Sequence, residues 1–317
     1  MPVAWAAEEA FANATGAKIV TDWTPGPSHN GRLHALVRRL QRVVGVSTSQ
    51  HGVTTRASRD VILFLMGLSK DVLPVLQDVS LRKWLYLFDT WEPGWQWTED
   101  ILQKAMSVQC VYMSSSQSVE HFRGRLQCDV QWLPQAAIST EFSPKALDWG
   151  KKRKTILNIG RTNRVLDDFF VGFSQKHGFK YLRDEYPGQM LFKTRAAFLS
   201  ALYEAQIVVV HPRNFEYPEL TGRVSMLTAR NFEAYQSGGV VCGFKPDSGE
   251  FERVLDGFPF VEFGCAEQFE VELLSAVRDS SCWRTATEEC MRRHTWECRV
   301  SKMAHSIQQK IANLGGI

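Results

Sequence analysis

Residues 227–244, with the sequence LTARNFEAYQSGGVVCGF, decide the fold that we expect for this chain. Thr228 is a suitable N-cap for a short helix, and Gly238 can end that helix because glycine tolerates the left-handed conformation common at helix ends. The Gly-Val-Val-Cys-Gly run that follows predicts a buried strand. A helix that carries the Glu233 carboxylate, a Gly-Gly turn and a buried strand are together typical of a ligand-binding edge in an open α/β sheet.

Strands and helices alternate along the rest of the chain in the same way. The apolar runs 61–65 and 206–211 have the composition of strands buried on both faces, as in parallel sheets. Leucine and valine recur at helical spacing in residues 32–42, which predicts an amphipathic helix. Residues 143–154, rich in Pro, Lys and Trp, predict a linker. We therefore expect two α/β domains with parallel sheets, the first over residues 1–142.

The composition limits the classes of protein that fit. The chain has 317 residues, of which 44% are hydrophobic and 22% charged, which is ordinary for a globular protein and long enough for two domains. A net charge of +3 permits an anionic ligand such as a nucleotide but does not indicate nucleic-acid binding. Seven cysteines occur without a C-x-x-C pair, and we find neither a signal peptide nor an apolar run of about 18 residues. We therefore expect a cytoplasmic protein with free thiols and no membrane span.

The start of the expected second domain predicts a phosphate site. Residues 154–160 have a strand pattern that ends at Gly160, and Arg161, Arg164 and a helix from Val165 follow. Backbone N–H groups, the helix dipole and guanidinium groups would then point at the same place. A basic turn that binds nothing is the alternative. Arg223 is a possible second phosphate contact.

A metal site is an alternative at only one place. Cys290, His294 and Cys298 are spaced by four residues, so that a helix would place them on one face. We expect these side chains to pack as part of a core stripe, with metal binding as the alternative. The chain has no Asp-x-Asp pattern. Such a pattern would supply paired carboxylates for a metal ion, so we expect no metal in the predicted phosphate site. We also expect no cofactor there.

Residues 227–244 resemble the donor-sugar region of GT-B glycosyltransferases, especially the family-1-like and CgeB/YkvP-like branch. In these enzymes an R-x-F-E-A-x-x-x-G pattern supplies a carboxylate for the donor sugar or ribose. The version with two glutamates has the first one eight positions earlier, where this chain has Ser225, so only the second is present. The residues that match the pattern are Arg230, Phe232, Glu233, Ala234 and Gly238.

The resemblance implies two Rossmann-like domains with parallel sheets that face each other across a cleft. It implies that the donor diphosphate lies on the Gly160–Arg161 turn and the start of the helix after Thr228, and that Glu233 hydrogen-bonds ribose or sugar hydroxyls. Negative charge that develops on the leaving diphosphate would be stabilised by arginines. The donor-binding residues that we expect are Gly160, Arg161, Arg164, Arg223, Thr228, Arg230 and Glu233.

The first half of the chain would supply the acceptor side. Asp89 ends an expected strand, and His29 lies in a Gly/Pro-rich loop, so each is a candidate general base, with an ordinary surface role as the alternative. Trp91 and Trp95 lie in the Pro/Gly-containing stretch after Asp89. They would offer stacking faces to an acceptor, or else staple the loop to the domain.

The sequence thus predicts a metal-independent glycosyltransferase that uses a nucleotide sugar as co-substrate. The acceptor is open among a glycan, a lipid-linked intermediate, a small molecule and a modified nucleic-acid base. The second domain would span residues 155–293, and residues 294–317 resemble the closing helix of CgeB-like transferases, which packs back on the first domain. The alternatives are a catalytically inactive GT-B-like binding module and a nucleotide-sugar epimerase of the same fold.

Overall fold

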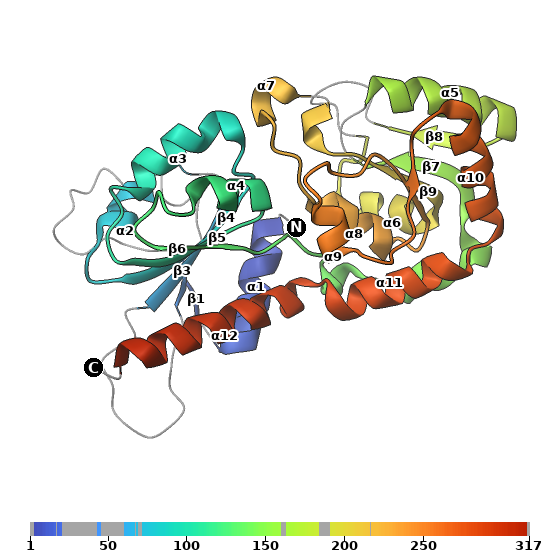
Figure 1. Cartoon of the computed structure of the whole chain (residues 1–317). Coiled ribbons are helices and arrows are strands. Elements are labelled where there is room, and N and C mark those ends of the chain that lie inside the picture. The colour runs from blue at the N-terminus through green and yellow to red at the C-terminus, as the bar shows by residue number, and fades with distance from the viewer. Residues whose placement is uncertain are drawn as a thin grey trace. The chain divides into compact units, whose positions relative to one another are not determined.

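The computed structural model describes residues 3–16, 18–20, 43–45, 60–66, 68, 72–159, 163–183, 191–215 and 217–315. The chain forms two compact units (Figure 1). The first contains Met1–Pro134 and Trp296–Ile317, and the second contains Gln135–Thr295. The predicted helix 32–42 and the loop that contains His29 lie outside the described residues.

The first unit is built on a six-stranded sheet with the order β1-β2-β3-β4-β5-β6. The pairs from β3 to β6 are parallel, as expected, but β2 pairs antiparallel with both β1 and β3. The prediction of a wholly parallel sheet was wrong for these two strands, because strand direction follows the path of the connecting chain, which local composition does not encode. The strands are β1 Lys18–Val20, β2 Val43–Gly45, β3 Asp60–Met66, β4 Arg82–Phe88, β5 Val108–Met113 and β6 Asp129–Trp132.

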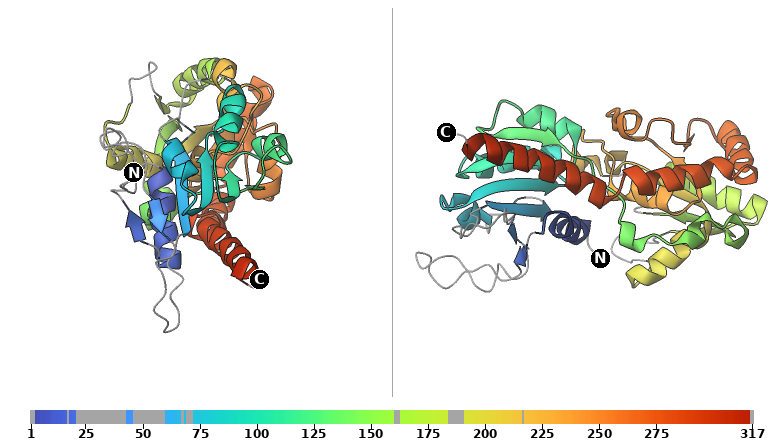
Figure 2. Two further views of the ribbon diagram at one scale, coloured as in Figure 1. Left: turned by 90° about the vertical axis from the view of Figure 1, so that its left-hand side faces the viewer. Right: turned by 90° about the horizontal axis from the view of Figure 1, so that it is seen from below.

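Both faces of the parallel part of this sheet are covered. Leu85 and Leu87 of β4 belong to an aliphatic cluster on one face, while Tyr86 and Phe88 lie 5.6 and 5.7 Å from the ring of Trp296 on the other. Helices α1 and α12 pack against each other in this unit (Figure 2), so the first and the last helix of the described chain belong to one unit. The helices are α1 Val3–Thr15, α2 Leu73–Gln77, α3 Trp95–Leu102, α4 Ser116–Phe122 and α12 Trp296–Gly315, with the 3-10 turn η3 Glu92–Gly94.

One fully buried cation holds the start of β4. The Lys83 ammonium donates hydrogen bonds to the carbonyl oxygens of Leu81, at 2.9 Å, and Met106, at 2.8 Å, and also to that of Asp78. Burial lowers the pKa of Lys83 to about 8, against a smaller opposing effect of the Asp78 charge. Lys83 therefore has a structural role, because it joins the turn before β4 to the segment before β5.

The second unit is built on a five-stranded sheet that is parallel throughout, as the sequence predicted. Its order is β11-β10-β9-β7-β8. The chain runs from β7 to β8 on one side and then returns to β9 on the other side of β7. The strands are β7 Arg153–Asn158, β8 Lys180–Leu182, β9 Ala205–Val210, β10 Val240–Gly243 and β11 Val261–Glu262.

This reversal of strand order places helices on both faces of the sheet. Because parallel crossovers are right-handed, α5 and α6 must lie on opposite faces of the sheet. Helix α5 pairs with α10 through Lys176 and Glu270, and α6 pairs with α8 through Tyr203 and Gln236. The helices are α5 Arg164–His177, α6 Arg195–Glu204, α7 Pro218–Thr221, α8 Ala229–Gln236, α9 Glu250–Val254, α10 Ala266–Arg278 and α11 Ser281–Arg293; the 3-10 turns are η4 Ser139–Glu141, η5 Pro144–Leu147, η6 Trp149–Lys151 and η7 Arg213–Phe215.

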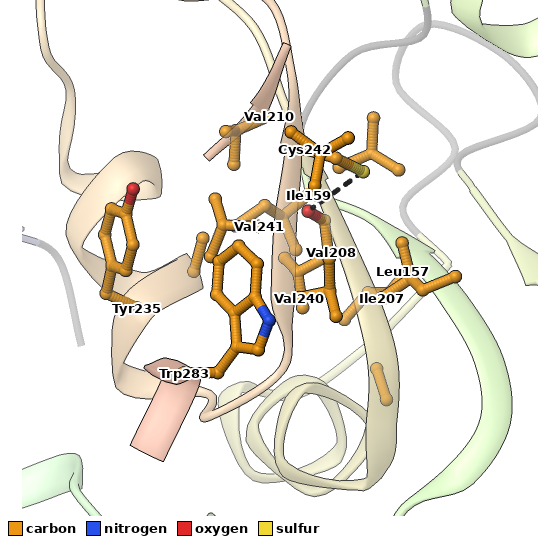
Figure 3. Close-up of a cluster of buried hydrophobic side chains, with 14 of the residues drawn as sticks. Leu157, Ile159, Ile207, Val208, Val210, Tyr235, Val240, Val241, Cys242 and Trp283 are labelled. Atoms are coloured by element: carbon orange, nitrogen blue, oxygen red, sulfur yellow. Dashed lines mark hydrogen bonds between the residues drawn. The ribbon is translucent and has the colours of Figure 1, made fainter. Parts of the chain in front are cut away.

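The segment that decides the fold has the predicted form. Thr228 precedes α8, Gly238 follows it with φ +73°, and β10 comes next. Figure 3 shows the strand in the core, with Trp283 beside Val240 and Val241 and with the Cys242 thiol 3.8 Å from the Val208 carbonyl oxygen.

The stretch predicted as a linker, residues 143–154, lies within the second unit. Lys152 anchors it there, because its buried ammonium donates to the carbonyl oxygens of Tyr203, at 2.9 Å, and Ser237, at 2.8 Å. Burial lowers the pKa of Lys152 to about 8. The sequence signal of Pro, Lys and Trp therefore marks 3-10 turns packed on this unit.

Candidate ligand site in the second unit

The strand order of the second sheet creates a topological switch point between β7 and β9. Open α/β sheets bind ligands outside the carboxyl ends of the strands at such a point, because the two flanking connections leave in opposite directions. The residues at this edge of the sheet are those after Asn158 of β7 and after Val210 of β9. Gly160 and Arg161 follow β7 in the sequence and lie outside the described residues.

Two buried amide oxygens near these strand ends have no hydrogen-bond partner within the described part of the chain. Asn158 is 5% exposed, and its Nδ2 donates to the Tyr181 hydroxyl at 3.3 Å, but its Oδ1 has no partner among the described residues. The same holds for the buried Oδ1 of Asn214, in η7 after β9. Buried acceptors are normally satisfied, so this edge suits a ligand that donates hydrogen bonds, such as a polyhydroxylated one.

The start of α5 offers a cation but few open N–H groups. The Oδ1 of Asn163 accepts the N–H groups of Val165 and Leu166 at 3.1 and 3.2 Å. Arg164 is 94% exposed and lies 3.9 Å from Asp168, a weak surface pair. Of the expected phosphate site, the described residues therefore present mainly the guanidinium of Arg164.

The start of α8 is also capped from within the protein. The N–H of Leu227 donates to Glu250 at 2.8 Å, that of Thr228 to Asn231 at 3.0 Å, and that of Ala229 to Gln135 at 2.9 Å. These are the groups that we expected to receive donor phosphates. A phosphate there would have to replace existing hydrogen bonds.

The loop before α8 shows how Ser225 replaces the first glutamate of the family pattern. Ser225 is fully buried, and its hydroxyl accepts the N–H of Asp247 at 3.2 Å. It ties this loop to the segment after β10 and faces the protein interior. Arg223, two residues earlier, is exposed.

Glu233 is the centre of an ion-pair cluster. Its Oε1 accepts from Arg195 at 2.6 Å, and its Oε2 accepts from Arg230 at 2.8 Å. The side chain of Glu233 is only 3% exposed, whereas that of Arg230 is 47% exposed. Arg195 also donates through Nε to Glu141 at 3.0 Å. The exposed group of the cluster is therefore a guanidinium, and the carboxylate predicted to contact a sugar lies behind it.

Packing fixes the members of this cluster. The Tyr203 hydroxyl donates to the backbone carbonyl of Glu141, and Gln236 of α8 donates to that hydroxyl at 3.2 Å. The ring of Phe198 lies 4.9 Å from the guanidinium carbon of Arg195 and 5.4 Å from that of Arg230, within cation–π range. Elements from η4, α6 and α8 thus hold one charge-balanced group.

Sequence analysis missed Arg195 and Glu141. They lie 38 and 92 positions before Glu233, so no local pattern joins them to it. One signal was available: Thr194 predicts a helix that starts with an arginine. A cation at the positive end of a helix dipole is unfavourable unless anions compensate it.

The structure describes three of the residues predicted for the acceptor side, Asp89, Trp91 and Trp95. Trp95 starts α3 instead of lying in a loop; its ring stacks on His121 at 4.2 Å, and its N–H donates to the Thr90 carbonyl at 3.2 Å. These contacts hold Trp95 on its own unit. Trp91 is half-buried, and Asp89 follows β4 with φ +49°, a conformation uncommon outside glycine.

The described residues contain no group of three His, Cys, Asp or Glu side chains that could hold a metal ion. Cys290 is fully buried in the core of the second unit. None of the described helices has an apolar stretch long enough to cross a membrane.

No protein-family model matches the sequence, and no curated protein matches it. HepE from Anabaena, solved in complex with UDP-glucose, matches the structure with a TM-score of 0.52 and 9% identity, over 78% of each chain. The N-terminal domain of a trehalose-6-phosphate phosphatase from Candida albicans matches with a TM-score of 0.51 and 10% identity, over 78% of this chain and 70% of that one. AviGT4, a glycosyltransferase involved in avilamycin A biosynthesis, covers 78% and 79% at 15% identity, with a TM-score of 0.46 that is too low to support an argument. At these identities the first two matches show a likeness of fold alone.

Proposed function

We propose that the chain is a glycosyltransferase that uses a nucleotide sugar as its donor. The observation that carries the proposal is the place of Arg230 and Glu233. They lie on α8, between β9 and β10 of a doubly wound sheet, which is where the resemblance to GT-B enzymes requires the donor-binding helix. The likeness of fold to HepE, which was solved with UDP-glucose, makes that compound the first donor to test.

The charges and acceptors of the second unit suit such a donor. Arg164, Arg223 and Arg230 are exposed cations of this unit, and an anionic diphosphate would pair with guanidiniums. The buried Oδ1 of Asn158, which lacks a partner among the described residues, would accept a hydrogen bond from a hydroxyl of the donor. Gly160, Arg161 and the start of α8 at Thr228 complete the proposed donor site.

The proposed reaction breaks the bond between the anomeric carbon and the diphosphate oxygen, and that oxygen leaves with the bonding electrons. The acceptor hydroxyl oxygen forms the new bond, and its proton passes to a base. Asp89 and His29 are the two proposed bases, with Trp91 and Trp95 as proposed acceptor contacts. Arginines stabilise the charge that grows on the diphosphate, which is the role that a divalent metal would otherwise have, so we propose metal-independent transfer.

The test is binding of UDP-glucose by calorimetry to the wild type and to Asn158→Leu. Asn158→Leu removes the proposed ligand acceptor and also the hydrogen bond from Asn158 Nδ2 to the Tyr181 hydroxyl. Binding should therefore fall by about tenfold, and the free energy of unfolding should fall by about 1 kcal/mol. Arg292→Ala, which changes an arginine paired with Glu289 on α11 at 2.6 Å, is the control and should bind normally. Release of UDP on addition of candidate acceptors would then establish transfer. Absence of binding by UDP-, GDP-, dTDP- and ADP-linked sugars would refute the proposal.

A binding module without transferase activity is the second candidate. Ser225 favours it, because the residue that replaces the first glutamate faces the protein interior and bonds Asp247. The two candidates differ in turnover. A module would bind the donor with the same dependence on Asn158 but release no UDP with any acceptor, and an epimerase would change the sugar without transferring it.

A further inference from the structure

The ion-pair cluster around Glu233 has one largely exposed member, Arg230. Glu141 and Glu233 are the two carboxylates, and their side chains are 12% and 3% exposed. The Arg195 side chain lies between the two carboxylates and is 25% exposed. Arg230 is the last member of the cluster, and its side chain is 47% exposed. The order of contacts is Glu141, Arg195, Glu233, Arg230, so each buried group bonds the next and the last reaches solvent.

Glu233 is poorly placed to contact a ligand itself. Both of its oxygens accept hydrogen bonds from arginines, and its side chain is nearly inaccessible. Arg230 uses one nitrogen, Nη1, for Glu233. A guanidinium has five N–H donors, so Arg230 retains donors that can bind an anion.

The position of Arg195 at the start of a helix is unfavourable for a cation. Arg195 is the first residue of α6, at the positive end of the helix dipole, where a cation is disfavoured. Burial alone would lower the pKa of Arg195, but the hydrogen bonds and charges of Glu141 and Glu233 raise it above its usual value. Such conflicts between local preference and tertiary position are concentrated at functional sites.

We propose that Arg195 and Glu233 are positioning residues for Arg230, and that the Arg230 guanidinium binds the diphosphate of the nucleotide-sugar donor. This inference rests on the proposed function and changes one part of it. Glu233 acts through Arg230 instead of contacting the ribose or the sugar. The ring of Phe198, which faces both guanidiniums, limits their movement and keeps Arg230 oriented.

The probes that test this inference separate the parts of the donor. Binding of UDP-glucose, UDP, inorganic diphosphate and uridine is measured by NMR titration against wild type, Arg230→Met and Glu233→Gln. Both changes should weaken the three diphosphate-containing probes by about tenfold, since each removes or misplaces a charge-assisted contact. Uridine, which keeps the ribose but lacks phosphate, should bind all three proteins alike. If Glu233→Gln weakens uridine as much as UDP, Glu233 contacts the ribose and the inference is overturned.

The double variant Arg230→Met/Glu233→Gln tests whether the two residues act as one. If Glu233 acts through Arg230, the double variant binds UDP no more weakly than Arg230→Met alone. Multiplication of the two single losses would overturn the inference. Arg195→Met should lower UDP affinity in the same direction, and Arg195→Lys should restore part of it because one ion pair can re-form.

Matched variants keep the test valid if a change impairs folding. Arg153→Met alters an exposed arginine that pairs with Glu204 at 3.1 Å in the same unit and should leave all affinities unchanged. If Arg195→Met does not fold, Arg195→Lys and Glu141→Gln provide the comparison. A wild type that binds none of the diphosphate probes overturns the proposed function together with this inference, whereas binding that is insensitive to Arg230→Met overturns the inference alone.

Discussion

The sheets of the two units differ in the order of their strands. The described strands of the first sheet follow one another in the order of the chain, whereas the second sheet reverses between β8 and β9. In the first unit, Trp95 and Ser118 both donate to the Thr90 carbonyl after β4, and the buried Thr90 hydroxyl has no partner among the described residues. In the second, Asn158 and Asn214 have buried amide oxygens without partners among the described residues. Strand–turn–helix patterns occur in both units, and the reversal of strand order distinguishes the second unit, where we propose the donor site.

The largest effect should come from a change at the end of β10 in the second sheet. Gly243 has φ +130°, and a Cβ there would overlap the carbonyl oxygen of Val210 in the neighbouring strand. Gly243→Ala should therefore lower the free energy of unfolding by about 4 kcal/mol, measured by urea denaturation. Gly249→Ala is the control, because Gly249 has φ +68° but open space around its Cα, and it should cost only about 1 kcal/mol. Equal losses would show that the close packing of β9 and β10 is not what makes Gly243 necessary.

The buried lysines allow the same change to be made in both units. Lys83→Met leaves three carbonyl oxygens of the first unit without their donor, and Lys152→Met leaves two in the second. We expect losses of about 3 and about 2 kcal/mol in the free energy of unfolding, respectively. A loss of less than half a kilocalorie for either would mean that water satisfies its carbonyls.

The pH dependence of these losses sharpens the comparison. Each lysine has a folded-state pKa of about 8, below the ordinary value of 10.5. Between these values the unfolded chain binds more protons than the folded one, so each lysine adds to stability as pH rises through this window. The difference between wild type and either Met variant should therefore be larger at pH 9.5 than at pH 7. The alkaline ionisation of thiols is common to wild type and variant and cancels in the difference. A difference that shrinks with pH would contradict the lowered pKa.

The smallest effect should come from Trp95. Trp95→Leu removes the stacking on His121 and one indole hydrogen bond, which should cost about 1–2 kcal/mol of unfolding free energy. Because these contacts lie in the first unit, the affinity for UDP-glucose should stay within about twofold of wild type. A fall in acceptor-dependent turnover at unchanged stability would support the proposed role of Trp95 in acceptor binding.

Local sequence determined much of the second unit. Capping by Thr228, the end of α8 before Gly238 and the buried strand β10 were all predicted, because each depends on residues within one turn or one strand. The parallel direction of this sheet followed from its alternation of strands and helices. The same argument failed at β1 and β2, whose pairing depends on the path of a longer connection.

The sequence by itself predicted helix α8, its end before Gly238 and strand β10, and it placed Glu233 on that helix. Only the tertiary structure decided what surrounds that carboxylate. Arg195 and Glu141 are brought to Glu233 by the packing of α6 and η4 against α8, over separations of 38 and 92 residues. Hydrophobic patterns specify which face of a helix is buried but not which side chain of another element meets it. The partners of a buried charge are therefore fixed by three-dimensional packing, and with them the difference between a carboxylate that binds a ligand and one that positions an arginine.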